Sequence, residues 1–100
     1  MSEICVTLLC PPAIEEKLLD LLLMSSATMV FTSTSTAAHG LAHEHLNQME
    51  QVLGRAQAVQ VQVVVAAGHR APMLDALRRQ FANTGLRYWV TPVLDAGEFV

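Results

Sequence analysis

The chain has 100 residues, of which 52% are hydrophobic and only 15% are charged. This length suits a single domain spanning residues 1–100, and so few charges do not cover every side of it, so we expect burial against other copies. The formal charge of −3 argues against nucleic acid or an anionic membrane as a partner. With no apolar run near the roughly 20 residues that cross a bilayer, and no secretory signal pattern, we expect a cytoplasmic protein.

The first part of the chain predicts a strand followed by a helix. In residues 3–10, EICVTLLC, apolar side chains alternate in a way that indicates a strand with one buried face. Cys5 and Cys10 fall on opposite faces of such a strand, so we expect two separate, reduced thiols. Pro11 and Pro12 end the strand, and PAIEEKLLDLLLM then predicts a helix. Its apolar stripe consists of Ile14, Leu18, Leu21 and Leu22.

Two further strands are predicted on either side of a long connection. Residues 28–36, TMVFTSTST, and residues 58–65, AVQVQVVV, have the β-branched composition and alternation of strands. The loop between them, residues 37–53, is long for a compact domain, which indicates a functional segment. We expect a short helix within it, because Leu46, Met49, Val52 and Leu53 have helical spacing, with Gly54 suited to end it.

The last third of the chain predicts a second helix and a final strand. Pro72 is predicted to open this helix, and Gly85 to close it. Its apolar positions are Leu74, Leu77 and Phe81. Residues 86–94, LRYWVTPVL, predict a strand, and Pro92 indicates that its far end lies at a sheet edge or outside the ladder.

This order of elements predicts an α+β ferredoxin-like plait (βαββαβ) with a long loop between strands two and three. Right-handed crossovers place both helices on one face of the four-stranded sheet, so the opposite face is bare. That face mixes apolar and small polar groups, as expected of a contact between subunits. Its predicted residues are Cys5, Thr7, Leu9, Val30, Thr32, Gln60, Gln62, Val64 and Trp89.

The residue types give little support to the known chemical functions of plait proteins. The central strands offer threonine and glutamine where an RNA-binding plait needs aromatic rings. The junction LLCPPA holds one thiol, whereas copper carriers use a Cys-x-x-Cys pair. Nucleophile elbows, phosphate-binding glycine loops and acid–base carboxylate pairs are also lacking, so we do not expect an enzyme.

Three histidines, His39, His43 and His45, lie within the long loop. A helical segment would bring His39 and His43 together, and an extended one would bring His43 and His45 together. Either pair suits a divalent transition metal, with Glu44, Glu50 or another subunit's histidine completing the shell. The alternatives are solvated histidines without a ligand and a proton sensor near neutral pH.

A second group of candidates suits an anion. Arg55 and Arg87 flank strand ends, and guanidinium groups match phosphate and carboxylate geometry. The hydroxyls of Thr34 and Thr36 in the TSTST run are suited to a phosphate or to a ligand shared between chains. The alternative is that this run is simply an exposed or interface strand of high β-propensity.

The segments CVTLLCPPAIEEKLLDLLL, FTSTSTAAHG, EQVLGRAQAVQVQV and RYWVTPVLDAGEF resemble a small PII-like family found in bacteria beside heavy-metal efflux pumps. The resemblance covers nearly the whole chain and extends to the trimeric protein CutA. It implies a trimer whose bare sheet faces pack around a three-fold axis. It also implies that residues 37–53 correspond to the mobile T-loop with which PII proteins touch their partners.

PII effectors, typically adenine nucleotides, bind in clefts between adjacent subunits near the base of the T-loop. The glycine-rich loop base and the basic C-terminal nucleotide motif of true PII proteins are not visible here, so no nucleotide-binding residue is transferred. We assign Thr34, Thr36, Arg55 and Arg87 to this interchain cleft as candidates. The leading hypothesis is a trimeric regulator that senses a metal or small ligand and contacts a metal-efflux protein; the alternative is a scaffold trimer without a ligand.

Overall fold

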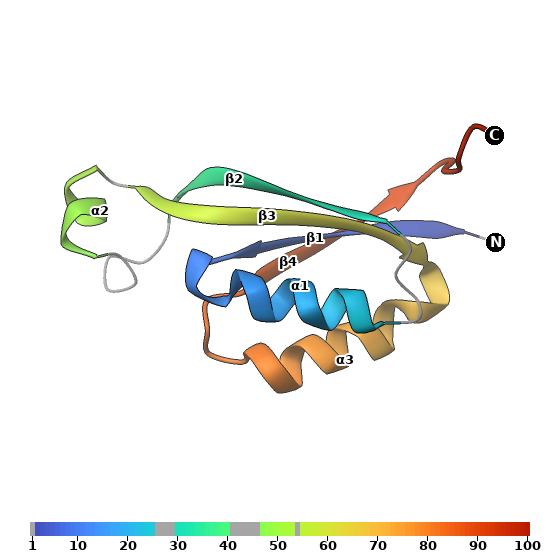
Figure 1. The fold of residues 1–100 in the computed structure, drawn as a ribbon, viewed down its shortest axis with the longest axis horizontal. Helices are drawn as coiled ribbons and strands as arrows, with labels where there is room; N and C mark the ends of the chain where they lie inside the picture. The colour runs from blue at the N-terminus through green and yellow to red at the C-terminus, as the bar shows by residue number, and fades with distance from the viewer. Residues whose placement is uncertain (1, 26–29, 41–46, 54) are drawn as a thin grey trace.

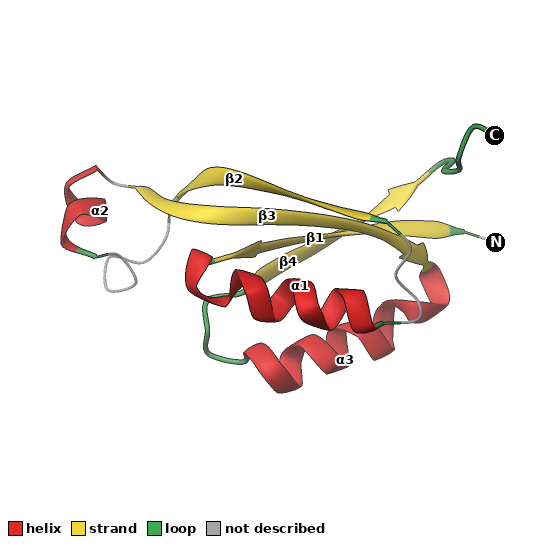
Figure 2. Ribbon diagram, in the orientation of Figure 1, coloured by secondary structure: helices red, strands yellow, loops and turns green. Residues whose placement is uncertain are grey.

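The computed structural model describes residues 2–25, 30–40, 47–53 and 55–100 of the chain. For residues 51–53 it describes the backbone alone. It shows one four-stranded antiparallel sheet with two long helices on one face (Figures 1 and 2). The plait predicted from the sequence is confirmed, with one short extra helix between the second and third strands. The elements are β1 (Glu3–Cys10), η1 (Pro12–Ile14), α1 (Glu15–Met24), β2 (Phe31–His39), α2 (Gln48–Leu53), β3 (Arg55–Ala66), η3 (Ala67–His69), α3 (Arg70–Phe81) and β4 (Arg87–Val93).

The strand order is β2-β3-β1-β4, so β3 and β1 are central and β2 and β4 form the edges. β1 pairs with β3 from Glu3 opposite Ala66 to Cys10 opposite Val59. The edge position of β4 explains why Pro92 is tolerated in it. A proline has no N–H to donate, and an edge strand has one side on which no hydrogen bond to a neighbouring strand is needed. The predicted edge placement of Pro92 is therefore confirmed.

The hydrophobic core lies between the sheet and the two long helices. Alternate residues of β1 and β3 point into it, and α1 and α3 contribute the facing side chains. The predicted stripe of α1 is confirmed, since Leu18 and Leu22 are fully buried and Ile14 and Leu21 pack against the core. Each buried leucine or valine contributes about 1.5–3 kcal/mol to folding relative to an exposed one. The core residues are Val6, Leu8, Cys10, Leu18, Leu22, Val59, Val61, Val63, Val65, Met73, Leu77 and Phe81.

The opposite face of the sheet carries no helix, and the register confirms which residues share it. One row across it consists of Thr32, Gln62, Thr7 and Trp89. Thr7 is only 2% exposed although no helix covers it, because its partners Gln62 and Trp89 flank it on the neighbouring strands. Trp89 itself is 45% exposed. Burial of a half-exposed indole against another surface is favourable, because apolar area is removed from water.

Several predicted boundaries were wrong. The long loop was expected to begin at Ala37, but β2 continues to His39, paired with β3 throughout. The third strand was expected to begin at Ala58 and instead begins at Arg55. α3 begins before Pro72 and ends at Phe81, before the expected stop at Gly85. The predicted short helix of the loop is confirmed by α2.

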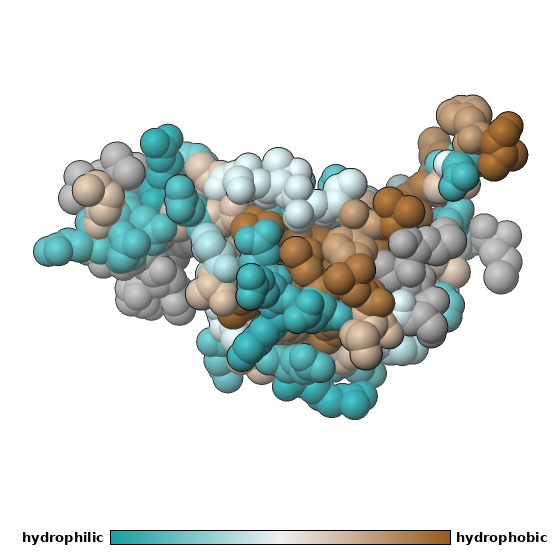
Figure 3. Space-filling view, viewed as in Figure 1, coloured by the Kyte–Doolittle hydropathy of each residue, from teal (hydrophilic) through white to brown (hydrophobic). Residues whose placement is uncertain are grey.

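β2 and β3 together form a hairpin that extends past the end of β1 toward α2 (Figure 1). Residues 55–58 of β3 pair with β2 alone, because β1 ends at Cys10 opposite Val59. We call these residues, the facing part of β2 and α2 the hairpin arm. The arm end of the molecule is largely hydrophilic, whereas hydrophobic side chains gather over the body and at the C-terminal end (Figure 3). Among the described residues, no helix has the length and apolar character needed to span a membrane.

Candidate functional site

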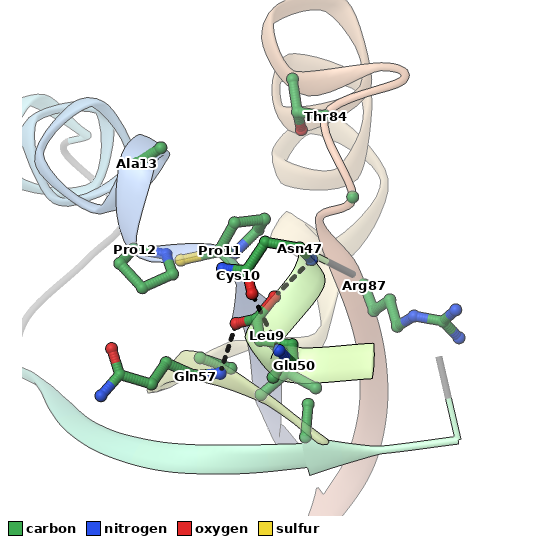
Figure 4. Close-up of a pocket in the computed structure, with 14 residues that line it drawn as sticks. Leu9, Cys10, Pro11, Pro12, Ala13, Asn47, Glu50, Gln57, Thr84 and Arg87 are labelled. Carbon is green, nitrogen blue, oxygen red and sulfur yellow. Dashed lines mark hydrogen bonds between the residues drawn. The ribbon is translucent and has the colours of Figure 1, made fainter. Parts of the chain in front are cut away.

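A cleft of about 390 Å³ lies where the hairpin arm leaves the body of the domain. It is bounded by the end of β1 and the turn after it, by the end of β2, by α2 and the outer part of β3, and by the turn that leads into β4 (Figure 4). Segments from four distant parts of the sequence thus meet around one hollow. Its volume lies within the range of small-molecule sites in proteins, about 300–1,000 Å³.

Small and rigid apolar residues make much of the cleft wall. Ala38, Ala56 and Ala58 are buried on the arm, and Pro11 and Pro12 form the facing turn after β1. Alanine leaves open space where a larger side chain would fill it, and proline fixes the backbone without offering a donor. The wall therefore suits the flat apolar part of a ligand.

Asn47 and Glu50 form a reciprocal cap at the start of α2. The Glu50 backbone N–H donates to Asn47 Oδ1 at 2.8 Å, and the Asn47 backbone N–H donates to Glu50 Oε1 at 3.1 Å. This is a capping box with asparagine as the N-cap, which satisfies backbone donors that a helix start otherwise leaves open. Both residues line the cleft. The Asn-x-x-Glu spacing is the sequence signal by which this cap could have been predicted.

The second oxygen of Glu50 joins α2 to the sheet. The Gln57 backbone N–H donates to Glu50 Oε2 at 3.1 Å (Figure 4). Gln57 lies on the stretch of β3 that has no β1 partner, so the carboxylate takes the place of a missing strand. A charged acceptor makes such a bond stronger than a neutral pair does.

The turn before β4 closes the other side of the cleft. Thr84 Oγ1 donates to the Phe81 carbonyl oxygen at 2.6 Å, which holds the chain as it leaves α3. Gly85 has a φ of +91°, and a Cβ placed there would lie 3.3 Å from Pro11 Cγ. Both the positive φ and the close approach favour glycine. The role of Gly85 is therefore to fit this turn against the β1–α1 junction, rather than to end the helix.

Arg87 lines the cleft and is exposed. Among the residues that the structure describes, the ion pair present joins Arg78 to Asp75, so Arg87 forms none with them. Arg55 lines a separate hollow of about 300 Å³, which shares Asn47, Glu50 and two β3 residues with the cleft. The two candidate anion-binding arginines thus lie in different hollows, with the Asn47–Glu50 cap between them.

The other predicted anion ligands lie far from Arg87 within one chain. Thr34 and Arg87 occupy the same row of the sheet but its opposite edges, β2 and β4. Three strand spacings of about 4.8 Å each separate them. Thr34 and Thr36 are exposed on the bare face and line neither hollow. These threonines would meet Arg87 only across a boundary between chains, as an interchain site requires.

Of the three candidate metal-binding histidines, His39 is the last residue of β2, exposed and opposite Arg55. His43 and His45 lie outside the described residues. Glu50, considered as a further ligand, has both carboxylate oxygens engaged by backbone N–H groups. Within the described part of the chain, no three of His, Cys, Asp and Glu come together as a metal site requires.

Cys10 does not have the features of a reactive nucleophile. Both cysteines are free thiols, as predicted. Burial, with a smaller contribution from the nearby Glu15 carboxylate, raises the pKa of the Cys10 thiol above its ordinary value of 9.0. Since the thiolate is the reactive form, Cys10 is inert at neutral pH.

The βαββαβ plait defines the chain as a protein of the ferredoxin-like fold, which PII-like proteins also have. The chain belongs to the DUF3240 family, described as a protein of unknown function, whose pattern matches residues 1–100. No curated protein matches the chain.

Solved structures agree with this placement. A DUF3240 family protein from Shewanella baltica superposes with a TM-score of 0.83 at 17% identity, covering 100% of this chain and 99% of that one. A putative PII-like signaling protein from Thermus thermophilus gives 0.65 at 16% identity, covering 93% and 88%. GlnK from B. subtilis, solved as a complex with ATP, gives 0.67 at 15% identity, covering 92% and 82%. At these identities the likeness establishes a shared fold.

Proposed function

We propose that this chain is a non-enzymatic, PII-like regulatory protein that works as a cytoplasmic homotrimer and responds to a small anionic ligand. The observation that carries the proposal is the cleft, because one of its walls belongs to the segment between β2 and β3. A ligand that fits one placement of this segment better than another shifts the balance between them. A partner protein that contacts residues 37–53 then binds one of these two placements in preference to the other.

The chemistry of the cleft supports an anionic ligand with an apolar body. Arg87 supplies a guanidinium group without an ion-pair partner among the described residues, and alanines and prolines supply a flat wall. The likeness to B. subtilis GlnK, solved with ATP, makes adenine nucleotides the first probes. We expect the edge of a second subunit to complete the site with Thr34 and Thr36.

The test is a thermal-shift and calorimetry series with ATP, ADP, AMP and inorganic phosphate. A ligand that prefers the native state raises the melting temperature by mass action. We expect Arg87→Gln to weaken binding at least about tenfold, since a charged hydrogen bond is lost. Arg79→Gln removes an exposed arginine from α3 and serves as the matched control. If none of the four probes raises the melting temperature or binds in calorimetry, the nucleotide or phosphate effector is contradicted and the scaffold trimer is favoured.

We also propose that His39, at the end of β2, binds a divalent transition metal together with His43 and His45, consistent with a partner among metal-efflux proteins. The three residues lie within seven positions of one another in the sequence, and imidazole suits zinc, copper and nickel. The triple replacement by alanine is expected to abolish binding of these ions in calorimetry, while His69→Ala, an exposed histidine elsewhere, leaves it unchanged. Equal binding by the triple variant and the wild type removes the metal role.

A further inference from the structure

The helix α2 is too short to be stable by itself. It has six residues, about half the length at which an isolated helix becomes marginally stable in water. Its placement must therefore come from contacts with the rest of the chain. Within the described residues, one side-chain hydrogen bond joins it to β3, the bond from the Gln57 N–H to Glu50 Oε2.

Glu50 makes two bonds that serve different purposes. Through Oε1 it accepts from Asn47 and keeps the helix start intact. Through Oε2 it accepts from Gln57 and keeps that helix against the sheet. Deleting this side chain removes the cap and the attachment together, whereas changing Asn47 removes only the bond from the Glu50 N–H to Asn47 Oδ1.

We propose that Glu50 is a latch, and that closing it fixes α2 as a wall of the cleft. The position of the residue supports this role, because Glu50 and Asn47 border both the cleft and the hollow containing Arg55. An open latch leaves the Gln57 amide on the stretch of β3 that has no β1 partner, where solvent or a ligand group replaces the carboxylate. The latch makes the placement of α2 a two-state property, closed with the Gln57 bond and open without it.

The electrostatics of the cleft connect the latch to the proposed function. A negative group held by Arg87 shares the cleft with the Glu50 carboxylate, and like charges in one small hollow repel. An anion therefore favours the open state, and by linkage the open state favours the anion. This consequence rests on the proposed function; the latch itself does not.

The latch is tested without any ligand, by amide hydrogen exchange on the full chain. Glu50→Gln keeps the size of the side chain and removes its charge; we expect about tenfold faster exchange of the Gln57 amide, with exchange in the core strands unchanged. Asn47→Ala is expected to accelerate the Gln57 amide less, because the Oε2 bond remains. Glu16→Gln removes the same charge from an exposed site on α1 and is the matched control.

Unchanged exchange of the Gln57 amide in Glu50→Gln overturns the latch. Equally fast exchange of this amide in Asn47→Ala and Glu50→Gln also overturns it, because Glu50 then acts only as a helix cap. If Glu50→Gln disturbs the core strands too, Glu50→Asp replaces it, since a shorter carboxylate keeps the charge and loses the reach. Faster Gln57 exchange in Glu50→Asp supports the latch, and wild-type exchange contradicts it. Failure of the nucleotide and phosphate screen affects none of these readouts.

Discussion

The two ends of β3 are held in very different ways. From Val59 to Val63 the strand pairs with β1 on one side and β2 on the other, and alternate valines enter a core covered by α1 and α3. From Arg55 to Ala58 it pairs with β2 alone, and Glu50 of a six-residue helix supplies the contact on the other side. The same strand therefore has a centre that is paired on both sides and an arm that is paired with one strand, so we expect lower local stability in the arm. Low local stability is the property expected of a segment that responds to ligands.

The largest expected effect comes from breaking the centre. Leu22 is fully buried between α1 and the sheet, so Leu22→Ala should lower the free energy of unfolding by about 2–5 kcal/mol. Leu23 is its exposed neighbour on the same helix, and Leu23→Ala should change stability by no more than about 0.5 kcal/mol. Urea denaturation of both variants measures the difference. Similar losses in the two would mean that the core is not where the structure places it.

The next effect in size concerns assembly through the bare face of the sheet. Gln62 lies in the middle of it, between Thr32 and Thr7. In a trimer packed on this face, Gln62→Lys places like charges close together without partners, so we expect dissociation into monomers in sedimentation experiments. Gln80→Lys adds the same charge on the outer side of α3 and should leave the assembly intact. A wild-type chain that sediments as a monomer contradicts the proposed assembly at once.

A smaller effect is expected at the turn that closes the cleft. Gly85→Ala combines a positive φ with a contact of 3.3 Å to Pro11, which should cost about 1–2 kcal/mol of stability. Gly97→Ala meets open space in the tail and should be neutral. Thermal unfolding compares them. Equal melting temperatures would show that the turn relaxes without strain.

The smallest effect concerns the pH response of the core thiol. Because burial raises the pKa of Cys10, the native state disfavours the thiolate, and stability should fall as the pH rises above the thiol's ordinary value of 9.0. Below that value the group is protonated in both states and contributes no pH dependence. In Cys10→Ser this loss of stability above pH 9.0 should be reduced, as followed by urea midpoints. A Cys5→Ser variant is the control from the opposite face of β1.

Much of the body was predictable because hydrophobic periodicity is a local property. The alternation in residues 3–10 matches β1 from end to end, and the stripe of residues 14–22 is the buried face of α1. Parity also predicted that Thr32, Gln62 and Thr7 share the bare face, whereas their alignment in one row was seen only in the structure. The end of β2 was missed because Ala37 and Ala38 have little strand propensity, and the pairing with β3 extends the strand anyway.

The cleft was not predictable in the same way. The sequence indicated Arg87 as a candidate anion ligand but gave no reason to place it beside Pro11, Ala56 and Glu50. The Asn-x-x-Glu spacing predicts a helix cap, yet nothing local indicates that the second carboxylate oxygen bonds Gln57. Arg55 and Arg87 look equivalent in the sequence, and the folded chain puts them in separate hollows.

By itself, the sequence determined the order of elements, the two faces of the sheet and the core stripes, because each depends on the spacing of neighbouring side chains. Only the tertiary structure decided which residues surround the cleft and how the arm is attached. β1 ends four residues short of the start of β3 in the ladder, leaving an open N–H at Gln57 that Glu50 fills. Such contacts depend on where strands end relative to one another, a long-range property that local patterns do not contain.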